Sequence, residues 1–148
     1  KKINDKKCIA ESTCSLGWIY AEGGYDSIDK IFSMFESGME IFKELEDIRA
    51  QILTYLDMSF IRMEEIEKSK QYVESSYELA KNFGNKVEIS VANICIGYHY
   101  SIWGGNYKLG DDFMRSGIEM SKEIDDKKLL SLGMQVLGES LYLQGEQV

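Results

Sequence analysis

A nine-residue pattern, SGMEIFKEL at residues 37–45, returns as SSYELAKNF at residues 75–83 and as SGIEMSKEI at residues 116–124. Each copy reads Ser, a small residue, an apolar residue, Glu and an apolar residue, followed by a Lys and a final apolar residue. The copies begin 38 and then 41 residues apart. A period of about 20 to 50 residues is the signature of a repeat protein. The chain is therefore predicted to contain one structural unit several times.

A second pattern, built on glycine, repeats outside these copies. Gly17, Gly97 and Gly138 are each followed seven residues later by another glycine. A large side chain comes three residues after the first glycine, and it is tyrosine twice and leucine once. Gly97 and Gly138 are 41 residues apart, the same spacing that separates the last two copies of the first pattern. Two independent patterns with a common spacing strengthen the prediction of a repeat.

The apolar spacing inside a unit is that of an α-helix. Leu53, Leu56, Phe60 and Met63 follow one another at steps of three and four residues. This spacing places them on one face of a helix, where they would form part of a core. No segment keeps up the alternation that is typical of a β-strand.

Glycines and N-capping residues mark the ends of the predicted helices, because the chain contains no proline. Gly23-Gly24, Gly84-Asn85 and Gly104-Gly105 separate the helical segments, and Asn85 and Asp26 are the predicted N-caps. The sequence predicts an all-α fold of about seven helices, over residues 7–22, 26–46, 48–63, 65–83, 86–103, 106–124 and 127–145. These helices are expected to form stacked antiparallel hairpins in one domain, residues 1–148, with units at about 8–47, 48–85 and 86–126 and a half-unit at 127–148.

Aligned in this way, the units resemble tetratricopeptide repeats over about residues 8–145. That family has a large residue followed by Leu-Gly and Tyr in its first helix, and small residues at set positions of its second helix. The first unit carries Leu16-Gly17 and Tyr20, and then Gly38. The second unit has Asp57 where the first-helix glycine would stand, and the proline that usually closes each repeat is absent. The resemblance implies a superhelix in which tiny residues let helices cross closely and the first helices line a concave face.

The resemblance also implies a groove along that concave face. Its expected exposed positions are largely apolar and aromatic, and contiguous exposed apolar surface usually marks an interface. We therefore predict a non-enzymatic interaction module that binds a peptide or a helix, as part of a regulator or scaffold. The expected contact residues are Trp18, Met58, Ile61, Ile94, Tyr98, Ile102 and Tyr142.

Other interpretations of the same residues stay open at this point. The side chains predicted to line the groove could instead pack between helices, and an error of one residue in register is enough for that outcome. A further segment of the parent chain could fill the groove. The alternative function is structural self-association as a homodimer through Leu137 and Leu141 of the last helix. A terminal repeat normally needs a polar cap, which this helix lacks.

Charge and hydropathy exclude two classes of partner. The chain has 17 Lys and Arg against 25 Asp and Glu, a formal net charge of −8, whereas a nucleic-acid interface needs clustered basic residues. No apolar run approaches the ~18 residues of a membrane span. We therefore expect neither nucleic acid nor a membrane as partner, and a cytoplasmic location.

The chain begins with Lys, so we expect a piece of a longer protein or trimmed ends.

The sequence offers no constellation for catalysis or metal binding. Cys8, Cys14 and Cys95 lack the Cys-x-x-Cys spacing of a zinc site, and they are expected to be small buried apolar residues in a reducing compartment. His99 is the only histidine, so a metal site of the histidine type has no second ligand of its kind. We expect no enzymatic activity, no cofactor and no metal.

Overall fold

Every regular element of the structure, a computed structural model, is a helix. The described residues are 2–62, 65–83 and 85–146, with side chains for residues 5–62, 65–83 and 85–145. The predicted all-α fold class is confirmed for these ranges. The elements are α1 (Lys2–Gly23), α2 (Ile28–Glu44), α3 (Ile48–Ile61), α4 (Ile66–Phe83), α5 (Lys86–Tyr98), the π-helix η1 (His99–Trp103), α6 (Tyr107–Glu123) and α7 (Lys127–Glu146).

Local side-chain caps explain where several helices begin. The Asn85 side chain accepts a hydrogen bond from the Val87 backbone N–H at 2.9 Å, which confirms it as the N-cap of α5. The prediction for Asp26 was wrong: Ser27 is the N-cap of α2, and the Asp26 carboxylate accepts the Ser27 N–H instead. Two residues used in the predictions, Met63 and Gly84, lie outside the described residues.

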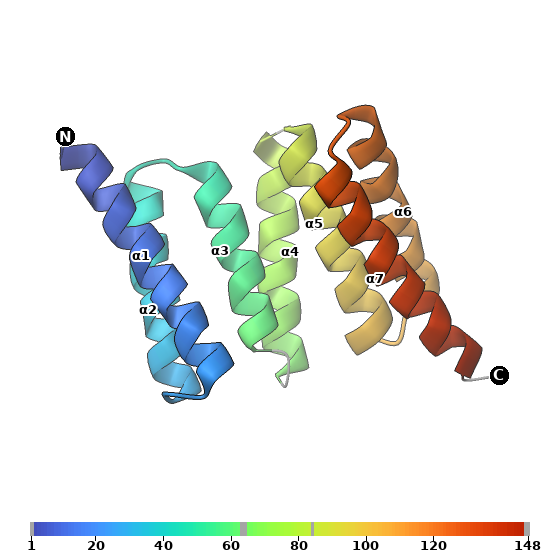
Figure 1. The fold of residues 1–148 in the computed structure, drawn as a ribbon, viewed down its shortest axis with the longest axis horizontal. Coiled ribbons are helices and arrows are strands. Elements are labelled where there is room, and N and C mark those ends of the chain that lie inside the picture. The colour runs from blue at the N-terminus through green and yellow to red at the C-terminus, as the bar shows by residue number, and fades with distance from the viewer. Residues whose placement is uncertain (1, 63–64, 84, 147–148) are drawn as a thin grey trace.

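The helices follow one another along the molecule, each antiparallel to the next, with α1 drawn in front of α2 and α7 in front of α5 and α6, and the two termini lie at opposite ends (Figure 1). Each helix packs against its neighbours in sequence, and α5 also packs against α3 and α7. The result is a stack of antiparallel hairpins, α1–α2, α3–α4 and α5–α6, followed by α7. The division into repeat units stays a prediction.

Glycines allow the close contact inside the first and third hairpins, α1–α2 and α5–α6. A Cβ atom built on Gly17 would lie 2.8 Å from the Phe35 ring, and one on Gly97 would lie 2.6 Å from the Gly110 carbonyl oxygen. Such distances are too short for real side chains, so these glycines let α1 approach α2 and α5 approach α6. This agrees with the role predicted for tiny residues where helices cross.

Many of the buried apolar side chains belong to two clusters along the stack. The first lies mainly between α1 and α2 and is centred on Phe35, with Phe32, Met39 and Phe42 around it. The second joins α3, α4 and α5 through Ile52, Leu56, Val73, Ala80, Ala92 and Ile96. Leu53 was expected on this core stripe, but it is 42 % exposed because its side of α3 faces away from the neighbouring helices.

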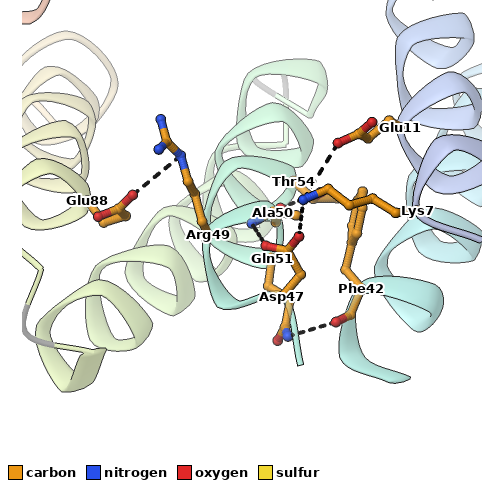
Figure 2. A network of polar contacts seen from close by, with 9 residues as sticks. All are labelled: Lys7, Glu11, Phe42, Asp47, Arg49, Ala50, Gln51, Thr54 and Glu88. Atoms are coloured by element: carbon orange, nitrogen blue, oxygen red, sulfur yellow. Dashed lines mark hydrogen bonds and ion pairs between the residues drawn. The ribbon is translucent and has the colours of Figure 1, made fainter. Parts of the chain in front are cut away.

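A polar network connects the first helices at the α2–α3 turn (Figure 2). Asp47 accepts the Ala50 N–H at 3.1 Å as the N-cap of α3 and pairs with Lys7 of α1 at 2.6 Å. Arg49, in the first turn of α3, pairs with Glu88 of α5 at 3.4 Å. These ion pairs link α1, α3 and α5 near the N-terminal end of α3.

Candidate functional site

Two hollows lie on the face formed by the first helices of the hairpins and α7. The first has a volume of about 440 Å³ and the second about 380 Å³. Phe60 of α3 lines both of them, so they adjoin at this ring, and we call the two together the groove. The first hollow is lined by Trp18, Ala21, Glu22, Gly24, Asp26, Ile28, Ile31, Phe60 and Ile61. The second is lined by Phe60, Ile94, Cys95, Tyr98, Leu132, Gln135, Val136 and Glu139.

Four of the seven predicted contact residues line this groove. Trp18 and Ile61 belong to the first hollow, and Ile94 and Tyr98 belong to the second. Trp18 is half-buried, and its ring stands edge-on to Phe35, with 6.4 Å between ring centroids. It therefore supports the core as well as the groove wall.

Two predicted contact residues were wrongly placed at the surface, since Met58 and Ile94 are only 3 % and 1 % exposed. Met58 packs into the apolar cluster around Phe35. Ile94 fills the space between α6 and α7, where Cβ atoms on Gly117 and Gly133 would lie 2.7 and 3.1 Å from its side chain. Ile94 can form part of the groove floor, but neither side chain can project toward a ligand.

The remaining two, Ile102 and Tyr142, line neither hollow. Ile102 lies in η1, where the Gly104 N–H donates to the His99 carbonyl oxygen five residues earlier, at 3.0 Å. A π-helical turn takes in an extra residue, so the chain beyond His99 departs from the regular rotation of α5. Tyr142 is 66 % exposed near the end of α7.

The lining residues that the sequence did not predict include Phe60, Leu132 and Val136. Phe60 had been placed on the core stripe of its helix, yet it is half-buried and lines both hollows, where they adjoin. Leu132 and Val136 are one helical turn apart on α7. Their spacing of four residues was the available signal, because it repeats the i, i+4 relation that puts Ile94 and Tyr98 on one face of α5.

Asp57 is a partly buried carboxyl group between the first helices of the hairpins. It lies one turn before Phe60 and Ile61 on α3, and its carboxyl interacts electrostatically with Cys14 of α1 and Cys95 of α5. Burial raises the pKa of Asp57 to about 6, and a hydrogen bond from the Trp18 side chain lowers it in part. A half-buried carboxylate therefore faces the space between the first helices at neutral pH.

The cysteines and the histidine differ in their surroundings. Burial raises the pKa of the Cys14 thiol to about 11 and that of Cys95 to about 12, so both stay protonated at neutral pH. Cys8 is exposed, which corrects the expectation that all three are buried, and all three are free thiols. His99 is buried, and burial lowers its pKa below the ordinary value.

Among the described residues, no group of three or more His, Cys, Asp or Glu side chains is placed to hold a metal ion. None of the helices described here combines the length and the apolar character that crossing a bilayer requires.

No protein-family model matches this chain, and no curated protein matches it.

Proposed function

We propose that the chain is a non-enzymatic, tetratricopeptide-like interaction module of the cytoplasm that binds a polypeptide segment in the groove. The observation that carries the proposal is the pair of hollows joined at Phe60, with apolar and aromatic walls. A concave, mainly apolar site with a few polar groups is the usual form of a binding site. Trp18, Ile61 and Tyr98 remain contact residues in this proposal, and Phe60 and Leu132 join them.

The groove can be tested by selecting binders from a phage-displayed library of random peptides. The variants Ile28→Asn and Leu132→Asn each place a polar amide in one hollow, at side chains that are 45 % and 42 % exposed. We expect the selected peptides to bind each variant at least about tenfold more weakly than the unchanged protein, as for loss of an apolar anchor. The measurement is the dissociation constant by fluorescence anisotropy.

Phe83→Asn is the matched control for these variants. Phe83 is 50 % exposed at the end of α4 and lines neither hollow, so its replacement should leave the dissociation constants within about twofold. A selection that enriches no peptide, or peptides that bind all three variants alike, contradicts the proposal. Circular dichroism establishes that each variant is folded.

The second candidate function is self-association through α7, and the glycines of this helix favour it. Gly97 abuts α6, whereas Cβ atoms on Gly138 and Gly145 would meet nothing within 4 Å. Met134 and Leu141 beside them are 61 % and 44 % exposed. A second copy could cover this stripe, because an antiparallel pair of α7 helices is self-complementary about a twofold axis.

Leu141→Glu should abolish such a dimer, because it places a charge in the middle of the apolar contact. The measurement is the molar mass by light scattering over a range of protein concentrations, with a dimer expected for the unchanged chain and a monomer for the variant. Ile19→Glu is the control, since Ile19 is 56 % exposed on α1 at the other end of the stack. A monomer at every concentration, or a dimer that survives Leu141→Glu, rejects this candidate.

A further inference from the structure

The charged groups around the groove are all acidic among the residues that line it. Glu22 and Asp26 lie at the first hollow and Glu139 lies at the second, and no Lys, Arg or His lines either one. Asp26 is neutralised by an ion pair with Lys30. Glu22 has no cation within ion-pair distance among the described residues, and Glu139 receives only a hydrogen bond from the neutral Gln135 amide at 3.2 Å.

Asp57 lines neither hollow, but it adds a third uncompensated carboxylate beside the groove, next to Trp18 of the first hollow. No Lys or Arg in the described part of the chain lies within ion-pair distance of it, and Trp18 supplies its side-chain hydrogen bond. Several acidic groups elsewhere are paired with cations, as between Lys7 and Asp47 or Lys86 and Glu123. The charged residues that line the groove are acidic alone, so a bound segment meets carboxylates and no lining Lys, Arg or His along both hollows.

We infer that the groove takes a cationic apolar polypeptide segment, in which Lys or Arg side chains alternate with the apolar anchors. This inference rests on the proposed function of the groove. The ammonium or guanidinium groups would pair with Glu22, Asp57 and Glu139, while the apolar side chains fill the two hollows. Charge complementarity of this kind steers association and rejects acidic competitors. A phosphate-rich partner would meet the same repulsion as an acidic peptide.

A carboxylate that is partly removed from water gains more from a cation than an exposed one does. The attraction between two unit charges grows as the effective dielectric constant falls, and Asp57 is already desolvated enough to raise its pKa. Binding of a cation to Asp57 compensates a charge that the unoccupied protein holds at a cost. Asp57 is thus expected to contribute more to selectivity than either exposed glutamate.

Three synthetic peptides with one leucine pattern and Lys, Gln or Glu at the remaining positions test this inference. At about 0.15 M salt, we expect the Lys peptide to bind at least about tenfold more tightly than the Gln peptide, and the Glu peptide to bind most weakly. The triple variant Glu22→Gln, Asp57→Asn, Glu139→Gln should lose most of the preference for Lys. Isothermal titration calorimetry gives the dissociation constants.

A second triple variant separates the groove from the net charge of −8. Glu40→Gln, Glu78→Gln and Glu119→Gln remove three exposed carboxylates from the repeated positions of α2, α4 and α6. This control should keep the preference for Lys within about threefold of the unchanged protein. An equal loss of preference in both triple variants overturns the inference, because the preference would then come from the net charge alone.

The Gln peptide distinguishes failure of this inference from failure of the proposed function. If the Gln peptide binds as tightly as the Lys peptide and Leu132→Asn abolishes this binding, the groove binds peptides but the charge inference is wrong. If no peptide binds, or if binding ignores Leu132→Asn, the proposed function fails as well. Tighter binding of the Glu peptide than of the Lys peptide also overturns the inference.

Discussion

Phe35→Ala is expected to lower the free energy of unfolding by about 3–5 kcal/mol, the range for truncation of a buried Phe. Phe35 is fully buried at the centre of the first apolar cluster, between the Gly17 backbone of α1 and the Trp18 ring. Its loss leaves a cavity between α1 and α2 that Gly17 and Trp18 cannot fill, since both are fixed in the packed helix α1. Equilibrium unfolding in urea, followed by circular dichroism, measures the change.

Phe83→Ala is the matched control for this substitution. Phe83 is 50 % exposed, so we expect its replacement to cost well under about 1 kcal/mol, as is usual for surface positions. The Trp18 ring packs edge-to-face against Phe35. The tryptophan emission of Phe35→Ala should therefore shift to longer wavelength, as the Trp18 indole becomes more solvated. Trp103 contributes to the same emission. Equal stabilities of the two variants would show that Phe35 is not at the core of the α1–α2 hairpin.

Asp57→Asn is expected to raise the free energy of unfolding by up to about 3 kcal/mol at pH 7.5. Burial raises the pKa of this carboxyl from 3.8 to about 6 in the folded protein. A raised pKa means that the folded state binds the proton more tightly than the unfolded state does. The stability that Asp57 contributes is therefore complete below about pH 4 and is lost as the pH rises through 6.

The test is the difference in unfolding free energy between Asp57→Asn and the unchanged protein, measured from pH 3.5 to pH 7.5. We expect about zero at the acidic end and the full difference above about pH 6.5, because the amide does not titrate. Asp112→Asn, at an exposed position of α6, should change the unfolding free energy only slightly at both pH 3.5 and pH 7.5. A difference for Asp57→Asn that does not change with pH would show that the carboxyl is not desolvated.

The loss of folding stability that Asp57 causes at neutral pH is relevant to the function of the groove. A residue that destabilises the folded protein at neutral pH is typical of a site where binding has taken priority over stability. The same substitution is expected to stabilise the chain and to weaken its preference for a cationic peptide. These opposite effects of one change would link the pH titration to the binding experiments.

Several features of the fold could be predicted because they depend on neighbouring residues. The repeated SGMEIFKEL-type pattern and the paired glycines located the helices and the small residues at their crossings, and Asn85 capped α5 as expected. Caps, helical spacing and glycine turns act over a few residues, so they can be recognised without knowledge of the neighbouring helices. The all-α fold followed from them.

The groove could be predicted only in part, because its walls depend on how each helix is rotated about its axis. The sequence by itself determined which segments are helical and which of them carry apolar side chains. The tertiary structure decided that Met58 and Ile94 face inward, that Phe60 lines both hollows, and that Ile102, in the π-helical turn, lines neither. It also decided the high pKa of Asp57. Helix rotation and desolvation result from packing against several elements at once, and such contacts lie beyond the range of local sequence patterns.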